Sequence, residues 1–284
     1  MKKAFLLLGA GSLLALTSCR KDIGRFDGST NPLESHEQVV EYHIPTYDAA
    51  YPPRFPFLFK KIYDPSGKTV KEIDCSFWDV QSPSQLFLDE FYHTLKVEQK
   101  GRMVYLINTQ LTKENTPDTV ARITLNNQGR PESCAASPAL DPDAASKPAV
   151  TEYYTYKNDR VTLVKSVYNG EIPSTPPQPF TYTIVDTVHY DNVGNPISFL
   201  GNSYQYDYTK KPKQQFYCDD FMGGDEPFFL LEYLGYFPEV TCPVNLRTHV
   251  ATLIFSGDLT NHQFDSKGRL ISYDFYAPIT ITWK

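Results

Sequence analysis

Apolar and polar residues alternate along several short segments of the chain. In the best example, Tyr204, Tyr206 and Tyr208 are separated by polar residues. The same alternation is present in residues 271–275 and 279–283. Successive side chains of a β-strand point to opposite faces, so each segment predicts a strand with one apolar face and one wet face. The chain is therefore expected to be mainly β.

A short turn pattern recurs between the predicted strands. Its clearest copy, residues 264–270, reads aromatic residue, Asp, two polar residues, Gly, basic residue and apolar residue. Asp or Asn opens such a turn by accepting a backbone hydrogen bond, and Gly takes the left-handed conformation that closes it. We expect a β-hairpin at each copy. The other copies are residues 63–69 and 190–196, with weaker ones at 97–103, 125–131 and 156–161.

The regular spacing of the turn pattern is interrupted between Ser203 and Leu246. We interpret this stretch as an insertion, or as a repeat unit with a long connecting segment. Within it, residues 225–235 place acidic residues before an apolar run and a glycine at the end. That order predicts a short helix. The proline-rich stretches 138–148 and 172–179 are expected to be exposed loops.

The first 18 residues have the layout of a secretory signal peptide. A basic start precedes an apolar run over residues 4–16, shorter than the roughly 20 residues that span a bilayer. The run ends in Leu16-Thr17-Ser18-Cys19, which resembles the lipobox of bacterial lipoproteins. We therefore expect cleavage before Cys19 and lipidation of that cysteine. Each buried methylene of the acyl chains stabilises attachment by about 0.8 kcal/mol, so the anchor does not release on a cellular timescale.

The residues after Cys19 indicate at which membrane face the anchored protein lies. Surface-exported lipoproteins of gut Bacteroidota often carry acidic residues just after the cysteine, whereas this chain reads Arg20-Lys21-Asp22. The expected location is therefore the outer membrane facing the periplasm, with the lipid as the contact to the membrane. Residues 19–56 are expected to form an extended linker and residues 57–284 a β-rich domain.

The composition supports a β-fold and excludes nucleic acid as a partner. Aromatic residues make up 14% of the chain, and aromatic and β-branched side chains suit a pleated, half-buried surface. The net charge of −6 becomes −8 when Lys2 and Lys3 leave with the signal peptide. Phosphate binding needs clustered Lys and Arg, which an acidic chain of this kind does not favour.

Four cysteines besides Cys19 allow disulfides in a secreted protein. We prefer a bridge between Cys218 and Cys242, which closes a moderate loop for about 3 kcal/mol in the chain-entropy model. Four buried free thiols are the alternative. No pair has the spacing of zinc ligands, so no metal site is assigned. The candidates are Cys75, Cys134, Cys218 and Cys242.

No catalytic constellation is recognisable in the sequence. His36 opens a segment like a zinc-protease motif, but Val40 stands where the second histidine must lie. The other histidines are isolated along the chain and are interpreted as structural or surface residues. They are His43, His93, His189, His249 and His262. No nucleophile elbow or phosphate-binding loop is present, so we assign no catalytic residue and no cofactor.

Two further groups of residues have both a functional and a purely structural interpretation. Asp219, Asp220 and residues 225–226 offer carboxylates to calcium, but their spacing is not that of an EF-hand and a solvated acidic loop is expected. Trp78 and Trp283 could stack on sugar rings, although core packing accounts for aromatic residues in alternating strands.

The lipobox, the turns, the Tyr-rich strand at 204–208 and the Leu-rich segment after it together resemble a family of Bacteroidota lipoproteins of unknown function, described as porin-like in fold. The resemblance is clearest over residues 150–284. The turns are also similar to the YD repeats of large secreted β-shell proteins. The resemblance implies an antiparallel β-meander that forms a curved sheet or partial barrel with few short helices. It implies no established activity.

Three functions are compatible with these features. The leading hypothesis is a lipid-anchored, non-catalytic envelope protein that binds a glycan or an envelope protein on a sheet surface. The first alternative is a glycan-active hydrolase with dispersed carboxylates, which a deep groove with two facing acids would favour. The second is a structural component of an envelope complex, which a large exposed apolar patch would favour.

Overall fold

The computed structural model describes part of the chain, and Cys19 and the signal peptide lie outside that part. The described residues are 39–44, 57–80, 88–108, 118–136, 149–172, 176, 178–217, 227–251, 256–275 and 277–284. They form an antiparallel β-structure with two short helices, as the sequence predicts. The proline-rich stretch 138–148 lies outside them.

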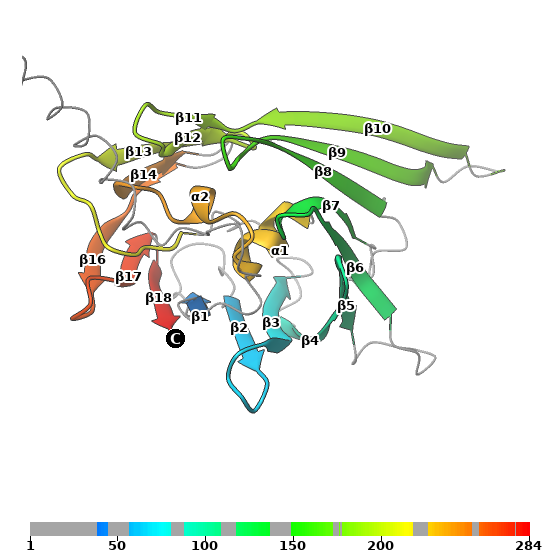
Figure 1. The fold of residues 1–284 in the computed structure, drawn as a ribbon, viewed down its shortest axis with the longest axis horizontal. Helices are drawn as coiled ribbons and strands as arrows, with labels where there is room; N and C mark the ends of the chain where they lie inside the picture. The colour runs from blue at the N-terminus through cyan, green and yellow to red at the C-terminus, as the bar shows by residue number, and fades with distance from the viewer. Residues whose placement is uncertain are drawn as a thin grey trace, which may run out of the picture.

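Thirteen strands form one large antiparallel sheet with the order β10-β9-β8-β7-β6-β5-β4-β3-β2-β1-β18-β17-β16. The sheet curves without closing, because its order ends at β10 on one side and at β16 on the other (Figure 1). The strands are β1 (Val39–Ile44), β2 (Phe57–Tyr63), β3 (Val70–Val80), β4 (Leu88–Lys100), β5 (Met103–Asn108), β6 (Asp118–Leu125), β7 (Pro131–Ala136), β8 (Ala149–Lys157), β9 (Arg160–Ile172), β10 (Gln178–Thr187), β16 (Thr260–Phe264), β17 (Leu270–Phe275) and β18 (Ala277–Trp283).

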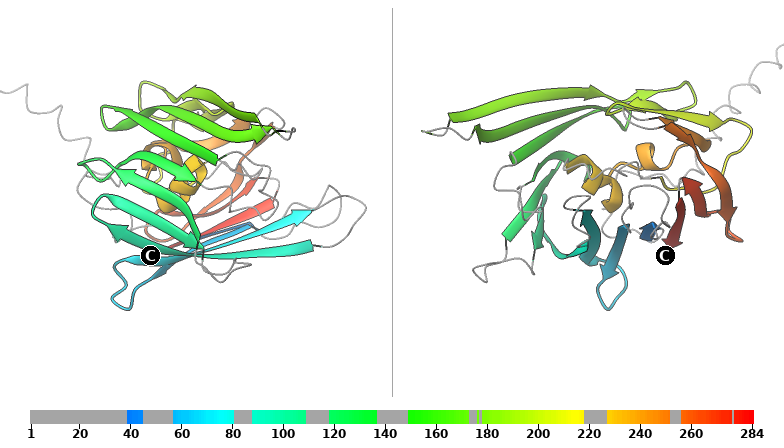
Figure 2. Two further views of the ribbon diagram at one scale, coloured as in Figure 1. Left: turned by 90° about the vertical axis from the view of Figure 1, so that its right-hand side faces the viewer. Right: turned by 180° about the vertical axis from the view of Figure 1, so that it is seen from behind.

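A smaller antiparallel sheet of five strands lies beside the large one, in the order β11-β12-β13-β14-β15. Its strands are β11 (His189–Tyr190), β12 (Pro196–Phe199), β13 (Asn202–Asp207), β14 (Leu246–Ala251) and β15 (Ser256–Asp258). The helices α1 (Pro227–Leu234) and α2 (Pro238–Thr241) come between β13 and β14 in the chain. The two sheets wrap around both helices (Figure 2).

Strand β1 corrects the predicted boundary of the β-rich domain. Residues 39–44 fall in the range expected to be a linker, yet β1 pairs with β2 on one side and with β18 on the other. Val39 and Tyr42 both point into the core, three residues apart, because the register shifts between Val39 and Glu41. This bulge breaks the two-residue alternation by which a strand is recognised in a sequence.

The predicted turns lie between antiparallel neighbours. In the turn from β2 to β3, the Asp64 carboxylate accepts hydrogen bonds from the backbone N–H of Lys68 and from the Ser66 hydroxyl. Gly67 has a φ of 68°, the left-handed conformation expected for the closing residue. The same arrangement of a capping Asp or Asn and a left-handed Gly recurs at Asn126 and Gly129, Asp191 and Gly194, and Asp265 and Gly268.

The turn at 156–161 uses different chemistry from the others. Asn158 and Asp159 join β8 to β9 with φ angles of 52° and 57°. Two successive positive φ angles are those of a type I′ turn, in which Asn and Asp are tolerated. A correction applies to the stretch 172–179, which is not a continuous loop: Ile172 ends β9, and Gln178 already begins β10.

The chain segment between β13 and β14 places α1 and α2 inside the curved sheet. We call residues 227–241 the plug. Helix α1 confirms the predicted helix and ends as expected at Gly235, whose φ is 88°. The N–H of Gly235 donates to the carbonyl of Glu232, and that of Tyr236 to the carbonyl of Leu231. These two bonds satisfy carbonyls at the helix end in the manner of a Schellman motif.

Aromatic side chains join the plug to the inner face of the sheet. Phe228 is fully buried and stacks on Phe237, with ring centroids 4.4 Å apart. Tyr154 of β8 lies against both rings, at 6.3 Å and 5.1 Å. On the other side of the plug, Phe59 of β2 stacks on Tyr233 at 4.8 Å. Burying such rings is the main favourable contribution to folding here.

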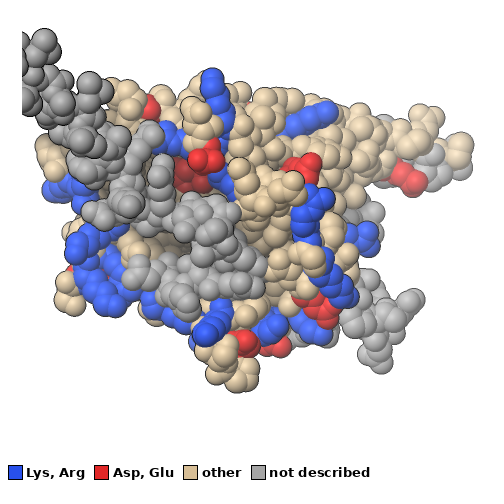
Figure 3. All heavy atoms as spheres, viewed as in Figure 1, with Lys and Arg blue, Asp and Glu red and all other residues tan. Residues whose placement is uncertain are grey.

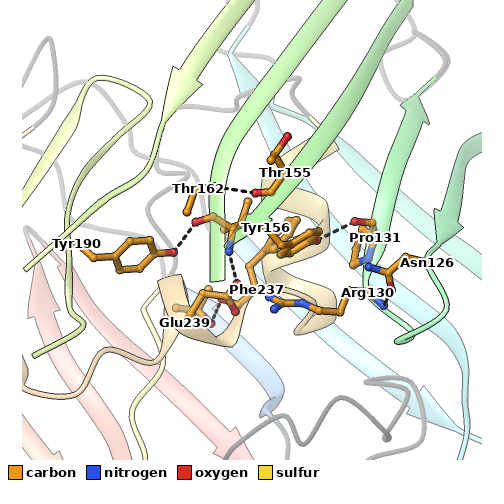
Figure 4. A network of polar contacts seen from close by, with 11 residues as sticks. Asn126, Arg130, Pro131, Thr155, Tyr156, Thr162, Tyr190, Phe237 and Glu239 are labelled. Carbon is orange, nitrogen blue, oxygen red and sulfur yellow. Dashed lines mark hydrogen bonds and ion pairs between the residues drawn. The ribbon is translucent and has the colours of Figure 1, made fainter. Parts of the chain in front are cut away.

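A buried polar network fixes α2 against the sheet (Figure 4). The Glu239 carboxylate forms an ion pair with Arg130 and accepts a hydrogen bond from the N–H of Val161 at 2.8 Å. The Arg130 guanidinium lies over the ring of Tyr156, 4.1 Å from its centroid. Tyr190 donates a hydrogen bond to the Val161 carbonyl at 2.9 Å. Turns and strands distant in the sequence therefore meet at one carboxylate.

Candidate binding surface at the edge of the large sheet

Strand β10 is the end strand of the large sheet and is exposed along most of its length. It pairs with β9 without interruption from Gln178 opposite Ile172 to Thr187 opposite Leu163. Of its ten residues, Phe180 and Asp186 are half-buried and the others are exposed. In Figure 1, β8–β10 extend beyond the helices. The predictions from the sequence do not include this strand.

The backbone of β10 is oriented so that alternate residues present their polar groups at the open edge. The N–H of Val188 donates to the carbonyl of Thr162, which extends the β9–β10 ladder by one residue. In an antiparallel pair, residues alternate between those that bond to the partner strand and those that face away from it. The even-numbered residues of β10 therefore bond to β9, and the backbone groups of Thr181, Thr183 and Val185 face away.

Aromatic rings gather on the inner face of β9 and β10. Tyr182 lies directly opposite Tyr168, and their rings stack with centroids 4.5 Å apart and an interplanar angle of 7°. Phe180 continues the stack, 5.9 Å from Tyr182. Ile184 follows on the same face of the strand. We call Tyr168, Phe180, Tyr182 and Ile184 the aromatic shelf; Tyr182 is 45% exposed and Ile184 is 42% exposed.

Exposed apolar side chains also occur on the outer face of these strands. Val185 of β10 and Tyr153 of β8 are 55% and 48% exposed. In the view of Figure 3, the surface over β8–β10 is mostly without charged side chains. On the outer face, Lys165 of β9 lies between Tyr153 and Val185, so these exposed apolar residues are isolated and ordinary. The grouped rings of the aromatic shelf beside the open strand edge are the candidate interaction surface.

A shallow depression of about 440 Å³ adjoins the end of β10. Its described lining includes Asp186 and Thr187 of β10 together with residues of β11–β13, among them His189 and Phe199. Asp186 is the single carboxyl in this lining, and partial burial raises its pKa above the ordinary value. The pair of facing carboxyls that a glycoside hydrolase requires is therefore not present in this depression.

His249 is not isolated, contrary to the interpretation from the sequence. Its Nδ1 lies 2.7 Å from a carboxylate oxygen of Asp258, and its Nε2 lies 2.9 Å from the hydroxyl oxygen of Ser256. The three residues come together because β14 and β15 pair as antiparallel neighbours. The signal that could have found them is a His followed seven residues later by Ser and nine residues later by Asp, a spacing that a hairpin would bring together.

The cysteines differ from the preferred prediction where the structure describes them. Cys134 and Cys242 carry free thiols, so the bridge between Cys218 and Cys242 is not formed. Cys242 is held in the plug region, where its Sγ lies 3.6 Å from the Thr241 hydroxyl and burial raises its pKa to about 11. The side chains of Cys75 and Cys218 lie outside the described residues.

The remaining candidates from the sequence are placed as follows. Trp283 packs against the core and donates an N–H to the Leu270 carbonyl at 2.6 Å, so it serves packing. The side chains of Trp78, Asp219 and Asp220 and residues 225–226 lie outside the described part. Among the residues that the structure describes, no cluster of three His, Cys, Asp or Glu could hold a metal ion. Within that same part, no helix is long and apolar enough to cross a membrane.

Comparison with known proteins adds solved structures of similar shape. No family model matches the chain, and no curated protein matches it. A porin-like protein from Bacteroides vulgatus is 14% identical, with a TM-score of 0.48, over 87% of this chain and 98% of that one. A porin-like protein from Bacteroides uniformis is 12% identical, with a TM-score of 0.45, over the same shares of the two chains.

Proposed function

We propose that this chain is a lipid-anchored envelope protein that binds an extended segment of another envelope protein along β10. The observation that carries the proposal is the open edge of the large sheet, where an exposed ten-residue strand lies beside the aromatic shelf. A partner strand can pair with the outward backbone groups and place apolar side chains against the shelf.

The geometry of the shelf favours a polypeptide over a glycan. Sugar rings bind to the free face of an aromatic side chain, but Tyr168, Tyr182 and Phe180 are stacked on one another. The flat ring faces on which sugars stack are therefore partly occupied by neighbouring rings, while Tyr182 and Ile184 stay 45% and 42% exposed to apolar side chains of a partner. The edge strand supplies backbone donors and acceptors at Thr181, Thr183 and Val185, which match the spacing of a second strand.

The N-terminal sequence supplies the second half of the proposal. The lipobox at 16–19 supports a lipid on Cys19, and residues between it and β1 connect the anchor to the sheet. The expected place is the periplasmic face of the outer membrane. Intact mass and membrane partition of wild type and Cys19→Ala test the anchor: a lipid-sized mass increment must disappear in the variant. Equal processed masses and equal solubility would overturn lipidation.

Proline at residue 183 provides a selective test of edge pairing. Thr183→Pro removes an outward N–H and leaves the ladder with β9 intact, since an edge strand tolerates proline where no donor is used. Thr183→Val is the matched control, because it keeps the N–H. Circular dichroism of both variants verifies that the sheet is retained.

The binding probe is a phage-displayed library of random peptides, selected on the wild-type protein. We expect selected peptides with alternating apolar residues, equal binding to Thr183→Val, and about tenfold weaker binding to Thr183→Pro, since losing one net hydrogen bond costs about 1 kcal/mol and the proline ring also blocks approach. Failure to select peptides, or equal binding by Thr183→Pro, would contradict the proposal. A wild-type dimer that Thr183→Pro converts to a monomer would assign the edge to a second copy instead.

A further inference from the structure

Three side chains with complementary chemistry lie on one face of the β14–β15 hairpin. His249 pairs directly with Asp258, and Ala251 pairs with Ser256. Because side chains alternate along strands, His249, Asp258 and Ser256 share one face, while Val250 points the other way and is buried in the core. The N–H of Leu259 donates to the carbonyl of Thr248 at 2.8 Å and closes the ladder beside the group.

The two contacts of the imidazole favour one tautomer of the neutral ring. The Asp258 carboxylate can only accept a hydrogen bond, so the neutral ring of His249 carries its proton on Nδ1, at 2.7 Å from the carboxylate. Nε2 then has a lone pair and accepts the hydrogen bond of the Ser256 hydroxyl at 2.9 Å. This order of carboxylate, imidazole and hydroxyl is the arrangement that activates a serine nucleophile.

Ser256 lies at the surface, beside small residues. Ser256 is exposed, its cross-strand neighbour is the small residue Ala251, and Gly257 separates it from Asp258 in the chain. The side chain of His249 is 22% exposed, whereas that of Asp258 is 76% exposed. Water around the carboxylate weakens its hold on the imidazole, so we expect reaction only with esters that have good leaving groups.

We propose that Ser256 is a nucleophile that cleaves carboxylic esters with good leaving groups, with His249 as its general base and Asp258 as a positioning residue. Ser256 Oγ bonds to the ester carbonyl carbon while its proton moves to His249 Nε2. The bond from that carbon to the alcohol oxygen breaks, and the alcohol takes the proton from Nε2. Water, deprotonated by the same nitrogen, then releases the carboxylic acid and restores Ser256.

Acetylation of the full-length protein by p-nitrophenyl acetate tests this activity, with the modified residue located by peptide mass mapping. We expect an acetyl group on Ser256 and release of nitrophenol. Ser256→Ala and His249→Asn should each lower the rate roughly a hundredfold, the size of a general acid–base contribution. Ser198→Ala is the matched control and should react at the wild-type rate, because this half-buried serine lies opposite His189 in the β11–β12 pair and, within the described part of the chain, no carboxylate completes a triad there.

The role of Asp258 has a separate readout. Asp258→Asn keeps the shape of the side chain but removes the carboxylate, and we expect a rate about fivefold lower, well below the loss seen where such a carboxylate is buried. Asp258→Glu restores a carboxylate and should recover part of the rate, which a merely structural contact would not do. Equal rates for wild type and Asp258→Asn would overturn this assignment.

An aryl fluorophosphonate probe separates a built nucleophile from ordinary serine reactivity. Folded wild type should be labelled at Ser256, and protein unfolded in urea should not. Absence of label at Ser256, equal labelling of the unfolded chain, or wild-type reactivity in His249→Asn would each overturn the proposal. These outcomes are independent of peptide binding at β10, because the three residues lie in the smaller sheet.

Discussion

Two aromatic residues on the inner face of the large sheet show how its regions differ. Tyr154 of β8 is 7% exposed beneath Phe228 and Phe237 of the plug region, whereas Tyr182 of β10 is 45% exposed. Both belong to the same sheet and the same alternating pattern. What differs is whether another element covers the face. An alternating strand becomes core where the plug lies over it and stays exposed, as the proposed docking surface, where the plug ends.

The largest expected effect comes from removing a ring under the plug. Phe228→Ala deletes a fully buried side chain that contacts Phe237 and Phe199, and should lower the free energy of unfolding by about 4 kcal/mol. Tyr182→Ala on the shelf should cost less than about 1 kcal/mol, because nearly half of this residue is already exposed to water. Urea denaturation of both variants measures this difference, and equal losses would contradict the comparison.

The next effect concerns the carboxylate that holds α2. Glu239→Gln leaves the buried Arg130 without its ion-pair partner and should destabilise the fold by about 3 kcal/mol. Glu132→Gln, at an exposed position of β7, is the control and should be nearly neutral. Thermal unfolding of the two variants compares them. A Glu239→Gln variant as stable as the control would show that the network does not hold the plug.

A buried lysine beneath the plug predicts a pH dependence. Lys61 donates to the Leu234 carbonyl at 3.2 Å, and burial lowers its pKa from 10.5 to about 7, with Cys242 opposing this shift. Above about pH 7, unfolding takes up a proton at Lys61, so the free energy of unfolding rises with pH. We expect a gain of roughly 2 kcal/mol from about pH 7 to about pH 9.

Substitution isolates this lysine from the other titrating groups. Lys61→Met should remove the rise in stability with pH, while Lys60→Met, at an exposed position of the same strand, should retain it. Denaturant melts at several pH values provide the measurement. A wild type whose stability is flat over this window, or a Lys61→Met variant that keeps the slope, would contradict a neutral buried lysine.

The smallest effect is expected at a turn outside both regions. Asp265 caps the β16–β17 turn through the N–H of Lys267 and Arg269 and through the Arg269 side chain. Asp265→Ala should cost about 1 kcal/mol, the usual size of a lost cap, while Ser266→Ala in the same turn should be close to neutral. A shift in the denaturation midpoint as large as that of Phe228→Ala would not fit a local role.

Local chemistry explains which features were predictable from the sequence. The turns at 63–69 and 264–270 were predictable because a capping Asp and a left-handed Gly determine them within a few residues. Helix α1 followed from an apolar run that ends at Gly235, but its place inside the sheet depends on contacts with Tyr154 and Phe59, which are distant in the chain.

The features that sequence analysis missed depend on pairing or exposure. Strand β1 was hidden by its bulge, and β10 by being exposed on both faces. The contact of His249 with Ser256 and Asp258 depends on the register of β14 with β15, which a single sequence does not specify. Recognising these features requires the pairing of residues that are distant in the chain, which residue type alone does not give.

Amide hydrogen exchange along β10, resolved by residue in the purified protein, tests most directly whether the large sheet has an open edge. The amides of Thr181, Thr183 and Val185 should exchange rapidly, and those of Tyr182 and Ile184 slowly, because only the latter bond to β9. A bound peptide should slow the first set. Equal protection of both sets in the protein alone would contradict an open edge and the docking surface built on it.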